Sequence, residues 1–538
     1  MRAKSLLLMS MVAAVLAGCD SGGIDLNVAT TDNSVDNSTS NSGGGGTTNP
    51  CAFYVDATNT TFRGAFDGTN CTYGSDFVGT SKPLTVNLTI PFISGIHIFQ
   101  DSLFVGQNVA SGVAPAAGTG PTLTIAAGST LAFSDSADYL LVNRGARINA
   151  VGSSTAPITF TGFTDAVTKT AGFQDVQLWG GIVINGNGIT NNCTDAQRTT
   201  NQCHVVSEGQ PSNYGGNNNT ESSGTLRYVV VKHPGFEVAP GDELNGITFN
   251  AVGSGTVVEN VEVYSTYDDG VEFFGGAVNV TNLVALYVRD DAIDFSDGYV
   301  GTVKNALVIH AATNSNHCVE GDSIGSGRSG TGVPFDTAPV SNPTIANLTC
   351  ILSNNDVGTH GDSMGILIRQ GARAQIQDSI VFSGFNPAAS NECLLLNGSA
   401  SLALAASGSS TIKSSIVACN QDTGPNDFAV SGTFANTDRA DQWVLGANPS
   451  VPGNANYSFN TNNVLITDAE NANVRILTPG TFFTATQFVN PAAANFNVTS
   501  VQAGVRIGAV TQAANWTANW TYGLVLTSGD PRKLWFAP

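Results

Sequence analysis

A tandem repeat in the middle of the chain places the strongest limit on its fold. The segment VVENVEVYSTYDDGVEFFGG (257–276) aligns with VTNLVALYVRDDAIDFSDG (280–298) at a constant offset of 22 residues. In a third copy, NHCVEGD (316–322) takes the place of DDAIDFS. A period of this length, with β-branched residues alternating with polar ones and with Asn and Gly at the bends, is typical of a solenoid of short strands. We therefore predict an all-β fold, a right-handed parallel β-helix with a cap at each end.

The repeat also predicts which residues are neighbours in space. Coils of a solenoid stack about 4.8 Å apart as parallel strands. Equivalent positions of successive repeats therefore lie above one another. Two polar columns follow from this registry, with Asp269, Asp291 and His317 in the corner column and Glu272, Asp294 and Glu320 in the outer column.

The surroundings of these columns can be predicted in the same way. We expect the outer column to face solvent beside a shallow groove, because its neighbours Gly270, Ala292 and Cys318 are small. A further column of amides is expected to point into the coil and to form hydrogen bonds from coil to coil. Its members are Asn260, Asn282, Asn305 and Asn347.

The composition agrees with a solenoid and narrows the choice of partners. The 538 residues include 60 Gly, and only 12% are charged, which fits many tight corners and few helices. Because each coil packs only on its neighbours, a chain of this length can form one domain. The formal net charge of −20 argues against binding to nucleic acid and against adsorption to anionic lipid. We expect a monomer that requires no cofactor, with Ca²⁺ as the one candidate ion.

The N-terminus has the features of an export signal. Two basic residues precede an apolar run at 5–18 that is too short to span a bilayer. The run ends in Leu-Ala-Gly-Cys, which resembles a bacterial lipobox. The resemblance implies a lipoprotein signal peptide at 1–18 and a lipid on Cys19, followed by a flexible Ser/Gly/Asn tether at 19–50. We predict an exported protein anchored at the outer membrane or cell surface, with the periplasmic face of the inner membrane as the alternative that Asp20 leaves open.

The other eight cysteines are expected to form disulfides. An even number of cysteines in an exported chain is typical of a disulfide framework. No CxxC pair occurs, which argues against a metal site built from these thiols. We predict sequential pairing: Cys51 with Cys71, Cys193 with Cys203, Cys318 with Cys350, and Cys393 with Cys419.

Short strands separated by Gly corners extend the coil over residues 84–430. We expect an N-terminal cap at 51–83, and the last coils with a Trp-rich cap at 431–538, because an uncapped end would expose apolar surface and free strand edges. A polar, Gly- and Asn-rich insertion at 190–224 interrupts the coils. Such insertions usually emerge on one face, which is often the binding face.

Several stretches resemble a widespread family of bacterial surface and secreted β-helix proteins. They are SGTLRYVVVKHPGF, ELNGITFNAVGSGT, YDDGVEFFGG and the later IGAV and NWTANWT, and the resemblance spans roughly residues 120–525. The family has no established activity that could be carried over. The resemblance therefore implies the architecture alone.

A second resemblance bears on chemistry. Polygalacturonase-type glycoside hydrolases carry Asn-Thr-Asp, Asp-Asp, Gly-His-Gly and Arg-Ile-Lys on successive coils, and similar places here hold Asp269, Asp290-Asp291, His317 and Arg369. The resemblance implies an inverting hydrolase in which Asp290 is the general acid, while Asp269 and Asp291 hold the attacking water. His317 would touch the sugar or tune a carboxylate, and Arg369 would hold a substrate carboxylate. The chain departs from the pattern, since no Asn-Thr precedes Asp269 and no Gly flanks His317.

The acidic columns thus have three interpretations. In a structural one, the corner acids accept hydrogen bonds from turn amides and the outer column is solvated. In a metal site, Glu272, Asp294 and Glu320, with Asp297 or Asp322, offer the oxygen ligands that Ca²⁺ prefers. The third interpretation is the hydrolase.

We favour a non-enzymatic surface protein that presents its long face to a glycan or another cell-surface partner. A polysaccharide-degrading hydrolase is the alternative. An insertion beside the acidic columns, with aromatic side chains lining a groove, would favour a ligand site. A flat acidic face would instead favour a scaffold or an adhesin.

Overall fold

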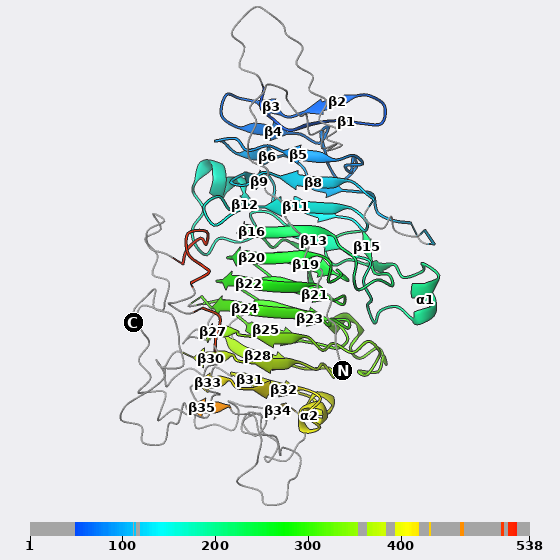
Figure 1. The fold of residues 1–538 in the computed structure, drawn as a ribbon, viewed down its shortest axis with the longest axis vertical. Coiled ribbons are helices and arrows are strands. Elements are labelled where there is room, and N and C mark those ends of the chain that lie inside the picture. Colours follow the sequence, from blue (N-terminus) through cyan, green and yellow to red (C-terminus); the bar gives the residue numbers. More distant parts are fainter. Residues whose placement is uncertain are drawn as a thin grey trace, which may run out of the picture. The chain divides into compact units, whose positions relative to one another are not determined.

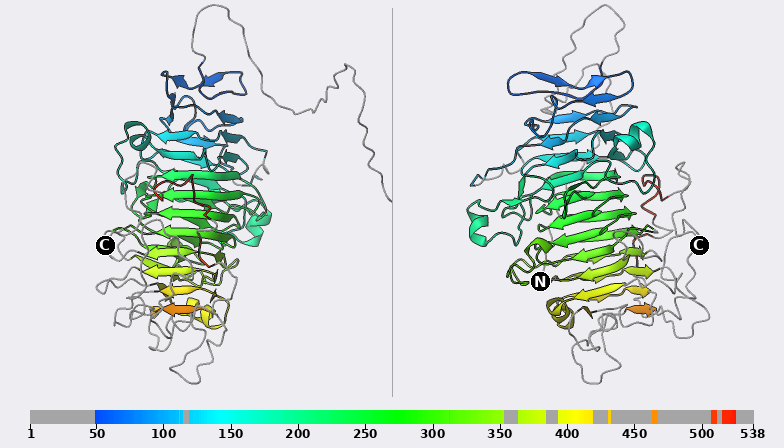
Figure 2. Two further views of the ribbon diagram at one scale, coloured as in Figure 1. Left: turned by 60° about the vertical axis from the view of Figure 1, so that its left-hand side comes forward. Right: turned by 180° about the vertical axis from the view of Figure 1, so that it is seen from behind.

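The computed structural model describes residues 49–538 except for 111, 114–118, 312, 353–362, 384–392, 419–429, 432–462, 467–506, 511–514 and 525–538. The predicted signal peptide, Cys19 and all but the last two residues of the predicted tether at 19–50 lie outside the described residues. The described part is a stack of parallel strands (Figures 1 and 2). The predicted parallel β-helix is therefore confirmed.

One side of the coil is a parallel sheet of 10 strands, which we call sheet 1. Its strands in spatial order are β7 (Leu103–Val105), β10 (Tyr139–Val142), β13 (Gly181–Asn185), β19 (Ile247–Asn250), β21 (Val271–Phe274), β23 (Ile293–Ser296), β25 (His317–Gly321), β28 (Met364–Ile368), β31 (Leu394–Asn397) and β34 (Val430–Ser431).

The other strands of the coil form one sheet of 19 strands, which contains two ladders. Four long strands run through both ladders: β16 (Gly224–Lys232), β20 (Val257–Tyr264), β22 (Asn279–Leu286) and β24 (Thr302–Ile309). Their first halves belong to ladder 2, with β5 (Leu88–Ile90), β8 (Thr122–Ile125), β11 (Arg147–Val151), β26 (Thr344–Ala346), β29 (Gln375–Gln377) and β32 (Thr411–Lys413). Their second halves belong to ladder 3, with β4 (Cys71–Tyr73), β6 (His97–Phe99), β9 (Thr130–Phe133), β12 (Ile158–Gly162), β27 (Thr349–Leu352), β30 (Ile380–Ser383), β33 (Ile416–Ala418) and β35 (Val464–Ile466).

The remaining elements decorate this coil. At the N-terminal end β1 (Phe53–Val55) and β2 (Thr61–Arg63) form an antiparallel hairpin, and β3 (Ala65–Phe66) pairs antiparallel with β4. The insertion contains α1 (Asp195–Thr199), β14 (Val205–Val206) and β15 (Asn213–Tyr214). The other short elements are η1 (Thr164–Thr168), β17 (Glu237–Ala239), β18 (Asp242–Glu243), η2 (Ser326–Arg328) and α2 (Ser399–Ala406).

The register between coils follows the repeat. Val271 on β21 pairs with Ile293 on β23, and both side chains are buried in the apolar core. Large rings stack along the interior in the same way, as Phe249 on Phe273 with centroids 5.3 Å apart. Equivalent repeat positions are therefore neighbours, as the sequence predicted.

The bends between ladders 2 and 3 explain the column of amides. Each long strand bends at one residue with positive φ, and in three of them this residue is Asn260, Asn282 or Asn305. Asn adopts this left-handed conformation more readily than most residues. Asn282 Nδ2 donates to Asn260 Oδ1 over 3.0 Å, and Asn305 Nδ2 donates to Asn282 Oδ1 over 2.8 Å. The coil-to-coil bonds are confirmed for these three amides, and Asn260 and Asn305 are buried at the bend, each 9% exposed, while Asn282 is partly buried.

Three of the predicted disulfides are present: Cys51–Cys71, Cys193–Cys203 and Cys318–Cys350. The third joins β25 of sheet 1 to β27 of ladder 3. Cys393 is also disulfide-bonded, but Cys419 lies outside the described residues, so their pairing stays a prediction. Disulfides form in oxidising compartments, which agrees with export.

A C-terminal segment lies along the side of the coil. We call residues 507–510 and 515–524 the strap. In Figure 1 the strap is the dark red trace beside β20, β22, β24 and β27. Tyr522 N of the strap donates to Glu262 Oε2 on β20 over 2.6 Å. The sequence predicted a cap at this end of the chain, whereas the described part of the segment packs against ladder 3.

The strap lies there because the outer side of ladder 3 is apolar. Strands such as β22 and β24 carry near-continuous apolar runs in their second halves, which is typical of strands covered on both faces. The strap and ladder 3 form one buried cluster of Tyr264, Val284, Leu286, Leu307, Ile309, Ile351, Ile380, Phe382, Ile416, Ile507, Ala509 and Val510.

Candidate functional site

The corner column links successive coils through bonds between side chains and backbone. Asp291 N donates to Asp269 Oδ1 over 3.0 Å, and His317 N donates to Asp291 Oδ1 over 2.8 Å. The column begins one coil earlier, where Asp269 N donates to Asn245 Oδ1 over 3.1 Å. All four side chains are buried. These acids therefore do what the structural interpretation expects, because they satisfy backbone amides at the bend.

The outer column is in register but is not exposed. Glu272 pairs with Asp294, and Asp294 with Glu320, across β21, β23 and β25. Glu272 and Glu320 are each only 6% exposed. The prediction of a solvated column was wrong because two other segments cover it. Glu208 of the insertion hydrogen-bonds to Glu272, and Arg369 forms an ion pair with Glu320.

The shallow groove predicted beside this column is also absent from the described residues. Ala292 and Cys318 belong to the apolar core, and Cys318 is bonded to Cys350 inside the coil. Gly270 is buried as well. Gly270 and Ala292 directly precede β21 and β23, and Cys318 lies near the start of β25, so all three positions are turned into the coil where its strands of sheet 1 begin.

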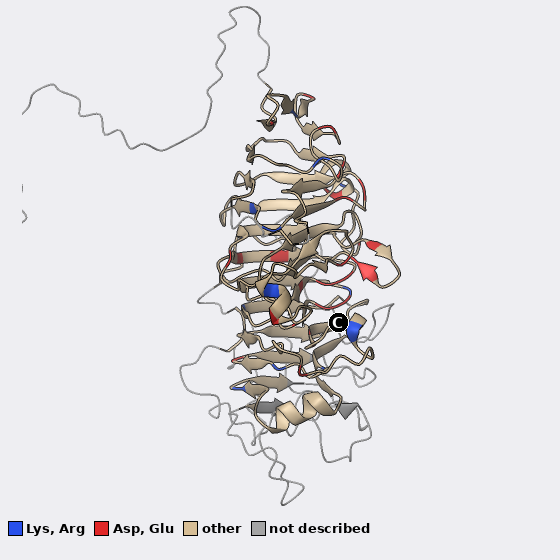
Figure 3. Ribbon diagram, turned by 90° about the vertical axis from the view of Figure 1, so that its right-hand side faces the viewer, with Lys and Arg blue, Asp and Glu red and all other residues tan. Residues whose placement is uncertain are grey.

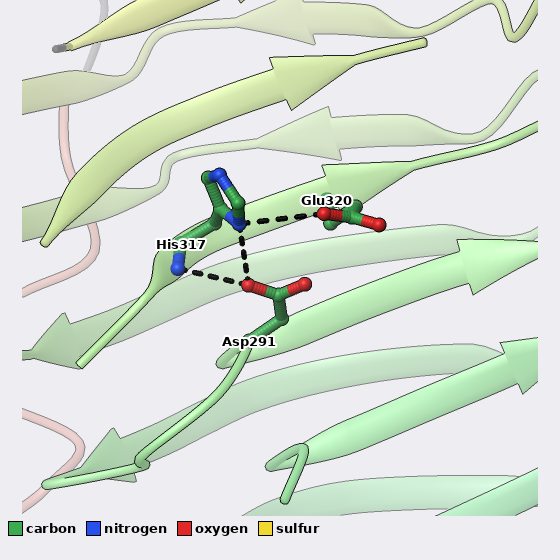
Figure 4. Close-up of side chains that lie close together, drawn as sticks. All are labelled: Asp291, His317 and Glu320. Atoms are coloured by element: carbon green, nitrogen blue, oxygen red, sulfur yellow. Dashed lines mark hydrogen bonds and ion pairs between the residues drawn. The ribbon is translucent and has the colours of Figure 1, made fainter. Parts of the chain in front are cut away.

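His317 and Arg369, the two residues expected to contact a substrate, are paired with acids of the protein itself. His317 Nδ1 lies 2.7 Å from Asp291 Oδ1 and 3.4 Å from Glu320 Oε2, so the three side chains point toward one another (Figure 4). Arg369 Nε donates to Asp322 Oδ1 over 2.9 Å, and its Nη2 pairs with Glu320. Burial and the nearby charge of Asp291 raise the pKa of Glu320 to about 9.

Two acidic triplets form where the columns meet. Asp268, Asp269 and Asp290 each place a carboxylate oxygen within 4.8 Å of the other two, and so do Asp269, Glu272 and Asp294. Burial, followed by repulsion between the carboxylates, raises the pKa values of Asp268, Asp269 and Glu272 well above the usual range. Carboxylates this close ionise together only when a cation or donors compensate them.

The spacing of the first triplet bears on the hydrolase interpretation. Inverting glycosidases keep about 6.5–9.5 Å between their two carboxyl groups to leave room for a water. Asp269 and Asp290 bring carboxylate oxygens within 4.8 Å of each other, and Asp290 Oδ1 also accepts from Asn316 Nδ2 over 2.7 Å. Carboxylate oxygens this close can share a proton or a cation.

A pocket of about 600 Å³ lies between the insertion and sheet 1, and we call it the insertion pocket. The ring of Tyr214 on the insertion lies 6.4 Å from that of Phe274 on β21. Arg328 Nη2 lies 2.7 Å from Asp297 Oδ1 at the end of β23. The residues that line the pocket include Val206, Glu208, Gln210, Tyr214, Val238, Asp242, Phe274, Asp297 and Arg328.

Sequence reasoning missed most of this pocket. Glu208, Gln210 and Asp242 do not follow the coil period, so no repeat marked them. The one signal was the position of the insertion beside the acidic columns. Asp297 was considered as a metal ligand, but its carboxylate is engaged by Arg328 and by the N–H of Gly325 over 2.9 Å. Figure 3 shows the side of the coil that carries α1, where Asp and Glu outnumber Lys and Arg in the middle coils.

Comparison with known protein families matches residues 116–414 to the pectate-lyase-like β-helix domain. The match covers more than half of the chain. The chain belongs to the pectate-lyase-like β-helix family. No curated protein and no solved structure shows significant similarity to it.

For this pectate-lyase-like β-helix protein, the family match covers both acidic columns and the insertion, whereas the strap lies beyond it. A shared fold does not carry a shared activity, so the function has to be argued from the site. Within the described residues, no helix is long and apolar enough to cross a bilayer.

Proposed function

We propose that this pectate-lyase-like β-helix protein is exported, anchored by a lipid on Cys19, and binds a glycan in the insertion pocket without cleaving it. The insertion pocket is the observation that carries this proposal, because a polar loop folds back over sheet 1 and encloses about 600 Å³. Ligand sites are typically concave, of about 300–1,000 Å³, with apolar walls and a few polar groups that fix orientation.

The walls of the pocket suit a sugar. Phe274 is partly exposed and offers ring surface to the C–H face of a pyranose, and the exposed Val206 and Val238 widen this apolar surface. The ring of Tyr214 is only 2% exposed and packs behind that of Phe274. The amide of Gln210 offers both a donor and an acceptor for hydroxyl groups. Gln210 is only 6% exposed, and neither polar atom of its amide has a hydrogen-bond partner among the described residues.

Binding without cleavage is supported by how the candidate catalytic groups are used. Asp269 and Asp291 are buried acceptors for backbone amides one coil away. Arg369 is held by Asp322 and Glu320. None of these residues lines the insertion pocket. The groups that a hydrolase would need are therefore committed to holding the coils together.

A divalent cation, with Ca²⁺ as the candidate, is a second proposal for the outer column. Asp269, Glu272 and Asp294 place oxygens within 4.8 Å of one another, and Asp294 Oδ1 has no hydrogen-bond partner among the described residues. Calcium takes six to eight oxygen ligands. The predicted ligand Glu320 contributes less to this group, because Arg369 already neutralises it.

Binding is tested on a glycan array with the mature chain carrying Cys19→Ala, so that it stays unlipidated. We expect retention on at least one class of oligosaccharide, and weaker retention after Phe274→Ala, because Phe274 is the partly exposed ring of the lining. A chain that binds no glycan on the array would contradict the proposal. Catalysis is tested by reducing-sugar release from polyuronates and neutral glycans. Release by the wild type that is lost in Asp290→Asn would establish the hydrolase instead.

The lipid anchor has its own test. The full chain expressed in a bacterium should incorporate labelled palmitate and sediment with membranes. Cys19→Ala should abolish both properties and leave the protein in the soluble fraction. If the Cys19→Ala chain still sediments with membranes, the anchor is not the lipid on Cys19.

A further inference from the structure

The charge of the insertion pocket limits which glycan it can hold. Three carboxylates line it, from Glu208, Asp242 and Asp297, and the one basic side chain in the lining is Arg328. Arg328 is committed to Asp297 over 2.7 Å and also donates to Asn191 O over 3.3 Å. Glu208 and Asp242 are therefore left without a cation in the lining.

The acids behind the lining add to this negative potential. Glu208 faces Asp242 and Glu243 from the β17–β18 hairpin, and Glu272 on β21. Asp242 Oδ1 accepts a hydrogen bond over 2.7 Å from Gly209 N, which is a neutral donor. Because Glu208 and Glu272 are hydrogen-bonded to each other, that pair shares one proton and keeps one negative charge. The wall therefore presents this charge and that of Asp242, and no cation of the lining balances them.

An anionic sugar would be repelled by this wall, since like charges brought close disfavour each other's ionised form. A neutral sugar would displace the water that solvates the carboxylates and would offer no charge in its place, which disfavours binding. A protonated amine supplies charge-assisted hydrogen bonds to both carboxylates, which are about twice as strong as neutral ones. The chemistry of the wall thus discriminates between three classes of glycan.

We propose that the insertion pocket selects a glycan with free amino groups, such as a glucosamine oligomer, over uronates and over N-acetylated oligomers. Glu208 and Asp242 hold the ammonium group, and the amide of Gln210 bonds the neighbouring hydroxyl groups. The inference rests on the proposed glycan site and adds its ligand class.

The test is calorimetric titration of the mature Cys19→Ala chain with three tetramers: glucosamine, N-acetylglucosamine and galacturonate. We expect the glucosamine tetramer to bind at least about tenfold tighter than either of the others. Glu208→Gln and Asp242→Asn should each weaken it about tenfold and leave the melting temperature within a few degrees of wild type. Asp336→Asn removes an exposed acid that does not line the pocket, and it should leave binding unchanged.

Each other outcome has a definite meaning. If the N-acetylated or uronate tetramer binds as tightly as the glucosamine tetramer, or more tightly, the proposed ligand class is wrong but the proposed glycan site is still supported. Equal weakening by Asp336→Asn overturns it too, because the attraction would then belong to the acidic surface in general. If none of the three tetramers binds and the glycan array is also empty, the glycan site itself fails.

Discussion

Two sides of the same coil are covered by other parts of the chain, and the two covers meet opposite kinds of surface. The strap lies on ladder 3 against apolar side chains such as Leu286 and Ile309. The insertion lies on sheet 1, where its Glu208 meets Glu272, and it leaves a pocket of about 600 Å³. Both covers come from outside the repeats that they protect.

The difference separates a cover that stabilises the fold from one that fits a ligand. Burial of apolar area stabilises the folded state by about 25 cal/mol per Å². Stabilisation of the coil is therefore enough to explain the strap. Burying carboxylates without a cation opposes folding, and groups with displaced pKa values gather at functional sites. The comparison therefore supports a stabilising role for the strap and the proposed binding role for the insertion.

The largest effect is expected at the strap. Leu286 is fully buried in the cluster that the strap completes. Leu286→Ala removes that packing and leaves a cavity, so we expect it to lower the free energy of unfolding by about 2–5 kcal/mol. Urea unfolding followed by fluorescence measures the loss. Glycan binding by the protein that remains folded should be unchanged, because Leu286 does not line the insertion pocket.

A loss below about 0.5 kcal/mol, which is typical of surface substitutions, would mean that the strap does not pack on ladder 3. Val113→Ala is a matched control, because Val113 is an exposed apolar residue of the described chain. Its effect should stay within that surface range. A comparable loss in both variants would remove the distinction between the two covers.

An intermediate effect is expected at the acidic triplets. The pKa values of Asp269, Glu272 and Asp294 are higher in the folded chain than in the unfolded one, because of burial and mutual repulsion. The folded state therefore binds the extra protons, and without a cation stability is full below about pH 4 and falls as the pH rises. Calcium at a hundredfold excess over its Kd should restore about 2.7 kcal/mol at pH 8.

Thermal unfolding at pH 4 and pH 8, with calcium or with excess chelator, measures both parts of this prediction. Calcium should have no effect at pH 4, where the carboxyl groups are protonated. Glu272→Gln should flatten the pH dependence and weaken the response to calcium. A melting temperature at pH 8 that chelator leaves unchanged would remove the cation proposal, and a chain more stable at pH 8 than at pH 4 would contradict the charge burial.

The repeat made the coil and the columns predictable from sequence. Registry requires only that each repeat takes the same path as the previous one, so the pairing of Glu272 with Asp294 could be inferred from a 22-residue offset. The same holds for the bends at Asn260 and Asn282, where a left-handed residue is needed in every coil. A local preference that recurs in every coil therefore lets the register and the bends be predicted from the sequence.

The covers could not be predicted because they are not repeated. Tyr522 reaches Glu262 across 260 residues of sequence, and Glu208 reaches Glu272 from an insertion without a period. Sequence periodicity says which side of a strand a residue occupies but not what lies against that side. That is why the acids of the outer column were expected in solvent, whereas Glu272 and Glu320 are found buried and Asp294 half-buried.

The smallest effect is expected at Glu262, a buried carboxylate that lies under the strap. Glu262 is fully buried, and burial raises its pKa well above the usual range. The ionised form of Glu262 therefore destabilises the folded state at pH 8, whereas at pH 4 its carboxyl group is neutral. Glu262→Gln keeps an acceptor for Tyr522 N, and Lys232 keeps its ion pair with Asp165 at 2.7 Å. We expect the free energy of unfolding of this variant, measured by thermal unfolding, to rise by about 1 kcal/mol at pH 8 and to stay unchanged at pH 4, with or without calcium.

Two outcomes would contradict this expectation. A stabilisation at pH 8 that disappears with calcium would mean that the strap and the insertion bury one connected acidic site. A lower stability of the variant at pH 8 would mean that the charge of Glu262 holds the strap.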